Sequence, residues 1–156
     1  MKISTRSLVI GAMIAALYVA LTLLLQAISF GAIQLRVAEA MTLLPVLFPE
    51  SIPGLFVGCL VANLLGGYGI ADIVFGSLAT LLSALLTWKL RKNLWLAALP
   101  PVLINAVVIG IMLYYVANAP LFLTMLTVGG GQALSVYVLG IPLLKVLQKH
   151  WGKTNA

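Results

Sequence analysis

Hydrophobic positions occur along this chain in long blocks, and polar positions occur in the short breaks between them. The breaks hold glycines, prolines and small groups of charged residues. This pattern predicts six helical elements, at Leu8–Ile28, Val37–Phe48, Ile52–Leu65, Ile70–Trp88, Leu94–Val116 and Leu121–Leu147. We therefore expect one all-α domain that covers residues 1–156.

The six elements differ in length. Four are long enough to cross a bilayer, whereas the second and third would reach only about 20 Å as α-helices, against a hydrocarbon core of about 30 Å. The segment "PVLFPESIPG" joins these two, and its prolines break or start helices. We expect a helical pair packed against the longer spans, with the turn at Glu50 at one membrane surface.

Composition places the chain in a membrane. Hydrophobic residues make up 63% of it, charged residues only 8%, and the mean hydropathy is +1.17. Soluble proteins carry about 25% charged residues. The N-terminal segment "MKISTRSLVIGAMIAALYVALTLLLQ" starts like a signal peptide, but its apolar stretch is long enough for a retained spanning helix.

Several classes of function are excluded by the same residues. The single cysteine, Cys59, allows neither an intrachain disulfide nor a Cys-based metal site, and we expect a buried thiol. The basic residues separate apolar runs, as orientation signals do, so nucleic-acid binding is not expected. We expect no catalytic residue, cofactor or metal, because no His/Asp/Glu cluster or Ser-His pair lies within a span.

The basic residues predict the orientation. With six crossings both termini lie on one face, and Lys and Arg mark the cytoplasmic side. That face receives eight of the nine basic residues, namely Lys2, Arg6, Lys89, Arg91, Lys92, Lys145, Lys149 and Lys153. The ninth, Arg36, falls on the outer side, so we expect it to have a local role.

Polar residues inside apolar elements are candidate functional residues, because each is costly in a bilayer. Arg36 and Glu39 begin the second element, Asn63 ends the third, and Asp72 begins the fourth. The predicted topology brings all four to one depth in the outer half of the membrane.

Two more polar residues, Asn105 and Gln132, fall near the middles of the last two elements, where they would form the floor of the same cavity. Gln132 follows the glycine run "VGGG", for which close helix packing and a local helix break near a ligand both stay open.

Arg36 and Glu39 are three residues apart and share one helical face. They form either an internal ion pair or one wall of a ligand site. Together with Asp72 they leave one excess negative charge, which favours a cationic or donor-rich ligand.

Small residues on the first element suggest a helix contact. Ala12 and Ala16 are four residues apart, with Gly11 and Ala15 on an adjacent face. Such spacing allows close approach of another helix. Internal packing and a docking surface for a separate membrane subunit both remain open.

The run "FGAIQLRVAEAMTLLPVLFPESIPGLFVGCLVANLLGGYGIADIVFGSLATLLSALLT" resembles the queuosine-precursor transporter (QueT) family. These proteins are the substrate-binding S components of energy-coupling factor (ECF) transporters. The resemblance covers about sixty contiguous residues, and the six-span layout agrees over the rest. The spacing of Ala12 and Ala16 resembles the alanine motif by which S components dock on the coupling subunit.

The resemblance implies an ECF S-component fold in the plasma membrane of a prokaryote. Its ligand would be a 7-deazaguanine such as 7-aminomethyl-7-deazaguanine, captured from outside. Its partners would be the coupling (T) subunit and two ABC ATPases, which supply the nucleotide chemistry this chain lacks.

Chemistry suggests roles within such a site. Glu39 and Asp72 would each receive one of two groups, the guanine-like N–H edge or the aminomethyl cation. Arg36 would orient Glu39 or contact the ring carbonyl, and Asn63, Asn105 and Gln132 would complete the polar edge. Two alternatives remain: an S component for another vitamin or purine, and a self-sufficient homodimeric transporter.

Overall fold

The computed structural model describes residues 4–29, 35–67 and 69–154 of the chain. Lys2, residues 30–34 and the side chain of Lys153 lie outside this part. The described residues form helices and no strand, which confirms the predicted all-α class. The helices are α1 Thr5–Leu24, α2 Gln26–Ser29, η1 Val37–Val46, α3 Ser51–Gly66, η2 Asp72–Gly76, α4 Ser77–Lys89, α5 Leu94–Ala97, α6 Leu99–Ala117, α7 Leu121–Ala133, η3 Leu134–Gly140 and α8 Ile141–Thr154.

Four segments of the described chain are long and apolar enough to cross a membrane. They are Thr5–Leu24, Asp72–Lys89, Leu94–Ala117 and Leu121–His150. The shorter apolar helices are η1 and α3, as the sequence pattern predicted. Helix η1 is a 3₁₀ helix rather than an α-helix. A 3₁₀ helix rises about 2.0 Å per residue, so this short element reaches about 20 Å.

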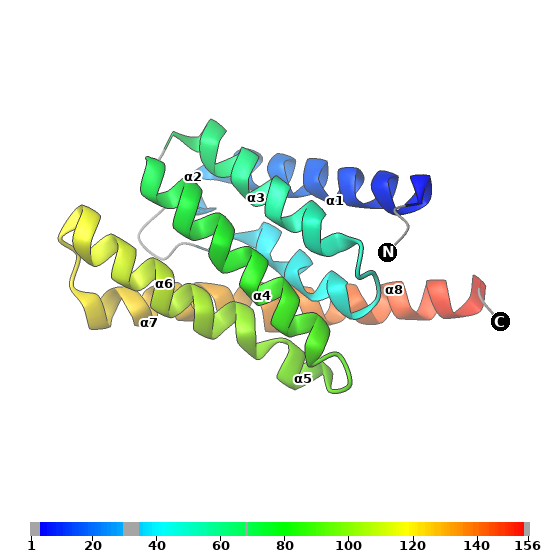
Figure 1. Cartoon of the computed structure of the whole chain (residues 1–156). Helices are drawn as coiled ribbons and strands as arrows, with labels where there is room; N and C mark the ends of the chain where they lie inside the picture. The colour runs from blue at the N-terminus through cyan, green and yellow to red at the C-terminus, as the bar shows by residue number, and fades with distance from the viewer. Residues whose placement is uncertain (1–3, 30–34, 68, 155–156) are drawn as a thin grey trace.

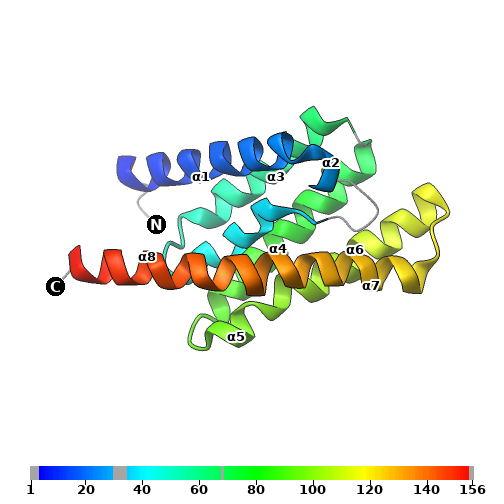
Figure 2. The ribbon, with the colours of Figure 1, turned by 180° about the vertical axis from the view of Figure 1, so that it is seen from behind.

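The helices run back and forth along one bundle (Figures 1 and 2). Helix α1 packs along α3, α6 packs along α7, and α4 contacts both α3 and α6. The 3₁₀ helix η1 lies among these layers and contacts α1, α4 and η3. The first turn of α1 and the last turn of α8 lie at the same end of the bundle in both views.

The distribution of side chains is inverted relative to a soluble protein. Large apolar residues face outward, and Leu24, Ile70 and Phe122 are 75% to 81% exposed. The buried residues include Arg36 and Glu39. Burial of ionisable groups behind an apolar surface is the arrangement expected of a protein whose solvent is the bilayer.

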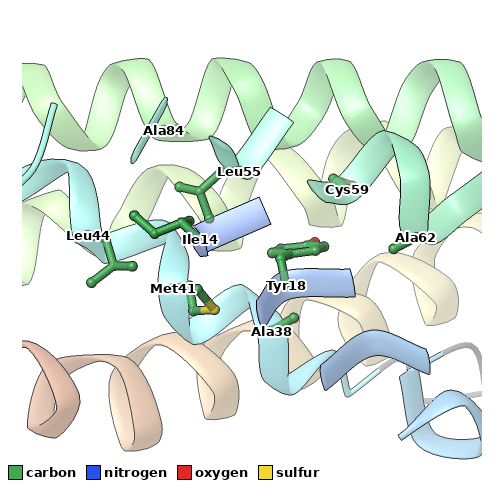
Figure 3. Packing of buried hydrophobic residues seen from close by; sticks show 9 residues of the cluster. All are labelled: Ile14, Tyr18, Ala38, Met41, Leu44, Leu55, Cys59, Ala62 and Ala84. Carbon is green, nitrogen blue, oxygen red and sulfur yellow. The ribbon is translucent and has the colours of Figure 1, made fainter. Parts of the chain in front are cut away.

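Helices α1 and α3 make the closest backbone approach that bears on the site. A Cβ atom added at Gly58 of α3 would lie 2.9 Å from Tyr18 Cβ and 3.0 Å from Ala15 Cα of α1. Gly54 likewise abuts Gly11. Figure 3 shows Tyr18 in the resulting interior, between residues of α3 and residues of η1. The glycines of α3 therefore allow α1 to bring Tyr18 into the core.

The glycine run Gly129 to Gly131 lies inside α7 and does not break this helix. Helix α7 continues through Gly129 to Gly131, and the π-helical segment η3 follows without a gap. Of the two alternatives left open for the glycines, a local helix break is therefore excluded for this backbone. Close packing holds at Gly129, where an added Cβ would lie 3.2 Å from Ala106 Cβ. The last helical body also extends past the predicted end at Leu147, to Thr154.

Candidate functional site

Four of the predicted site residues meet inside the bundle. Arg36 precedes η1, Glu39 lies in its first turn, Asn63 lies in α3, and Asp72 begins η2. Arg36 Nη2 lies 3.7 Å from Asp72 Oδ2, and Asn63 Nδ2 donates to the Asp72 carbonyl oxygen over 2.9 Å. All four are at most 7% exposed. Three sequentially distant segments thus build one polar cluster.

The ion pair of Arg36 is with Asp72 and not with Glu39. Of the two alternatives for Arg36 and Glu39, the direct ion pair is therefore not formed among the described residues, although their charges still act on each other through space. Spacing along one helix could not reveal Asp72 as the partner, because η2 reaches the start of η1 only through the tertiary fold.

Glu39 is held by neutral donors instead. Tyr18 Oη donates a hydrogen bond to Glu39 Oε1, and Thr80 Oγ1 donates to the same oxygen over 3.4 Å. Thr42 Oγ1 donates to the Glu39 backbone carbonyl over 2.6 Å. A 3₁₀ helix has three residues per turn, so Thr42 stands directly one turn after Glu39. These contacts fix both the backbone and one carboxylate oxygen of Glu39.

Cys59 lies at the centre of this polar network. Its Sγ accepts from Arg36 Nη1 at 3.7 Å and Asn63 Nδ2 at 3.5 Å, and it lies 3.3 Å from Thr80 Oγ1. The thiol is fully buried, as expected. However, the thiol contacts polar residues of the site as well as the apolar core.

Sequence reasoning missed Tyr18, Thr42 and Thr80 as members of the cluster. Thr80 carried a usable signal, because it follows Asp72 by eight residues and so falls two turns along the same helical face. Tyr18 carried only a weak one, as a single hydroxyl in an apolar helix. Its place opposite Glu39 depends on the approach of α1 to α3, which local spacing does not specify.

The two predicted floor residues are both buried, but they differ in their connection to the cluster. Asn105 of α6 is 3% exposed and approaches the Glu39 carboxylate. Gln132 of α7 is 5% exposed. No recorded contact among the described residues joins Gln132 to the other five predicted site residues.

Several polar atoms of these residues are buried without a hydrogen-bond partner in the described part of the chain. They are Glu39 Oε2, Asn63 Oδ1, Asp72 Oδ2, Asn105 Nδ2 and Gln132 Oε1. Buried polar atoms are nearly always satisfied in native proteins, so each exception needs an explanation. Four of these five atoms are acceptors and one is a donor.

Irregular helices surround the polar residues. Glu39 lies in a ten-residue 3₁₀ helix, although such helices seldom exceed four residues. Asp72 begins the π-helical segment η2, and the second π-helical segment, η3, begins two residues after Gln132. Segments of π-helix occur frequently at functional sites.

The described residues offer no set of side chains that could bind a metal ion. Nowhere in residues 4–29, 35–67 and 69–154 do three or more His, Cys, Asp or Glu side chains come together to hold an ion. The carboxylates of the cluster are instead arranged around a guanidinium, hydroxyl groups and amides.

The small residues of α1 divide between two faces. Gly11 and Ala15 pack against the backbone of α3. Ala12 and Ala16 are exposed on the outside of the same helix. Internal packing therefore accounts for the first pair and leaves the second pair on the bundle surface.

Comparison with known proteins supplies the class of molecule. The family model described as "QueT transporter" matches residues 8–149. The chain belongs to the QueT transporter family. A relative in this family, the queuosine precursor transporter QueT of Lactococcus lactis subsp. cremoris (strain MG1363), is 31% identical over 152 residues. The match covers 88% of this chain and 89% of the relative.

The QueT match takes in most of α1, the polar cluster and most of α8. It makes the chain a transporter rather than an enzyme, and the apolar helices agree with a membrane protein. No solved structure shows a significant match to this QueT family member.

Proposed function

We propose that this chain is the substrate-capturing S component of an ECF-type ABC importer, and that it binds a queuosine precursor from outside the cell. The ligand is a 7-deazaguanine such as 7-aminomethyl-7-deazaguanine. The observation that carries the proposal is a set of buried polar atoms without a hydrogen-bond partner, at Glu39, Asn63, Asp72, Asn105 and Gln132.

The chemistry of these atoms supports such a ligand. The predicted site residues together offer four free acceptors and one free donor. A guanine-like ring offers the complementary set, with N–H and amino donors beside one carbonyl acceptor. A ligand that fills this set removes the cost of leaving buried polar groups unpaired, which favours tight and specific binding.

The proposed topology has six crossings in the plasma membrane of a prokaryote, within one domain of residues 1–156. Both termini face the cytoplasm, in agreement with the shared end of α1 and α8 (Figures 1 and 2). Helices η1 and α3 make the second and third crossings, which places the polar cluster in the outer half.

The proposed partners are the ECF T subunit and two ABC ATPases. Docking uses the exposed face of α1, where Ala12 and Ala16 allow close approach of another helix. Both alanines are exposed, and Ala12 lies at the groove between α1 and α3, so a docked subunit can reach them without displacing the contact of Gly11 and Ala15 with α3.

Ligand binding and subunit recruitment are tested separately. Calorimetry of the purified chain compares 7-aminomethyl-7-deazaguanine with thiamine, biotin and riboflavin. Binding of the deazaguanine alone supports the proposal, whereas binding of a vitamin instead of the deazaguanine contradicts it.

For recruitment, the chain is affinity-purified from membranes that also contain the T subunit and the ATPases. The double variant Ala12→Phe, Ala16→Phe loses these subunits and keeps ligand affinity. Leu103→Phe, which changes an equally outward side chain on α6, is the matched control and loses neither. A chain that carries no ATPase and purifies as a homodimer would instead be a self-sufficient transporter.

A further inference from the structure

Two of the three acidic side chains of the chain are buried, and their surroundings differ. Glu50 lies at a turn near one end of the bundle, where its Oε1 accepts from Ser7 Oγ at 3.5 Å. Glu39 and Asp72 lie in the polar cluster and are 1% and 4% exposed. Only these two carboxylates can therefore meet a ligand held inside the cluster.

Asp72 already has a cation. Its Oδ2 accepts no hydrogen bond, but Arg36 Nη2 lies 3.7 Å away and balances its charge. The Asp72 backbone is fixed through its carbonyl oxygen, which accepts from Asn63. A cationic ligand at Asp72 would have to displace a guanidinium or lie beside it. Like charges in a water-poor site repel strongly, so this arrangement is unfavourable.

Glu39 has no ion-pair partner among the described residues. Tyr18 and Thr80 both donate to Oε1, and Asn105 approaches the carboxylate from α6. Oε2 is buried and accepts no hydrogen bond from the described residues. The Tyr18 hydroxyl, on a fully buried side chain, limits rotation of the carboxylate. One oxygen is therefore anchored, while the other is free to accept.

We propose that Glu39 is the residue that selects the charge of the ligand, with its Oε2 receiving an ammonium group, and that Asp72 acts only by positioning Arg36. This inference rests on the proposed function, because it specifies which part of the deazaguanine meets which carboxylate. The ligand class it names is a purine-like ring with a protonated amine side chain. A charge-assisted hydrogen bond of this kind is stronger than a neutral one.

Tyr18 and Thr80 are positioning residues in this arrangement. They act on the ligand through Glu39, by holding Oε1 and so directing Oε2. Asn105 approaches the same carboxylate from α6, and its unpartnered Nδ2 is a donor. The ammonium therefore has an acceptor at Glu39, and the ring carbonyl has a donor close by at Asn105.

The test uses two ligands of similar shape that differ in charge. They are 7-aminomethyl-7-deazaguanine, which carries an ammonium, and 7-cyano-7-deazaguanine, which is neutral. Calorimetry gives both affinities for the wild type, Glu39→Gln, Asp72→Asn and the control Glu50→Gln. The ratio of the two affinities is compared because a partly inactive preparation changes the number of sites and not the preference.

The wild type and Glu50→Gln are expected to prefer the amine. Glu39→Gln should lower the affinity for the amine by about tenfold to a hundredfold, with a change of less than about threefold for the nitrile. Asp72→Asn should lower both affinities by a similar factor and so keep the preference. Glu39→Asp, which retains the charge, should keep it as well.

Three results would overturn the inference: a wild type that prefers the nitrile, a Glu39→Gln variant that weakens both ligands equally, or an Asp72→Asn variant that alone loses the preference. A different result would contradict the proposed function itself, namely a wild type that binds neither deazaguanine.

Discussion

The substitution Gly58→Ala tests whether the close packing of α1 on α3 supports the site. The added Cβ would lie 2.9 Å from Tyr18 Cβ, about 0.5 Å inside ordinary van der Waals contact, and 3.0 Å from two backbone-linked atoms of Ala15. None of these atoms is the far end of a flexible side chain, so α1 itself has to move. Overpacking of this kind costs about 1–3 kcal/mol.

The expected result for Gly58→Ala is a melting temperature lowered by about 2–12 °C, since 1 kcal/mol corresponds to about 2–4 °C at this chain length. Tyr18 moves with α1 and loosens its hydrogen bond to Glu39, so ligand affinity should fall as well. Cys59 provides the assay, because it is the single cysteine and is fully buried. A thiol-reactive fluorescent dye therefore reports unfolding of the core during a temperature ramp.

Gly130→Ala is the matched control, because an added Cβ there would meet no atom within 4 Å. Alanine is favoured over glycine inside a helix by about 0.5–1 kcal/mol, so this variant should melt slightly above the wild type. Both substitutions replace glycine by alanine, but they are expected to change the melting temperature in opposite directions. A Gly58→Ala variant as stable as Gly130→Ala would refute the close packing of α1 on α3.

Two further substitutions test the polar cluster by the same dye assay and by calorimetry. Tyr18→Phe removes the hydroxyl that anchors Glu39 and keeps the buried ring, so stability should fall by about 1–3 kcal/mol and ligand affinity by at least about tenfold. A variant with unchanged affinity would contradict the positioning role of Tyr18. Gly76→Ala places a Cβ 2.8 Å from Asn63 Nδ2, so Asn63 must turn away from the Asp72 carbonyl. Ligand affinity should fall, and an unchanged affinity would remove Asn63 from the site.

Much of the fold could be predicted from the sequence, because long apolar runs leave few choices. The all-α class, the four long apolar segments and the two short apolar helices all followed from hydropathy and proline positions. The internal geometry of the helices could not be predicted in this way. Hydropathy does not distinguish α, 3₁₀ and π backbones, and η1, η2 and η3 depend on contacts with other helices.

The candidate site could be predicted as a set of residues but not as a set of pairs. Arg36, Glu39, Asn63 and Asp72 meet as expected, since each is costly in an apolar span and all fall at matching ends of their elements. The ion-pair partner of Arg36 could not be predicted, because spacing along one helix favours Glu39 over Asp72. The partners of Glu39 were missed because hydroxyl groups, unlike charges, are common in membrane helices and carry little signal.

The central claim is that the polar cluster around Glu39 is the ligand site. A competing location exists in the fold, namely a groove of about 620 Å³ between α1 and α3, lined mainly by apolar residues including Leu8, Pro53 and Val57. An experimental structure of the chain with bound 7-aminomethyl-7-deazaguanine decides between them. Our account predicts the amine within hydrogen-bond distance of Glu39 Oε2, with Tyr18 still bonded to Oε1. A ligand seated in the groove between α1 and α3, with Glu39 Oε2 still unpartnered, would contradict it.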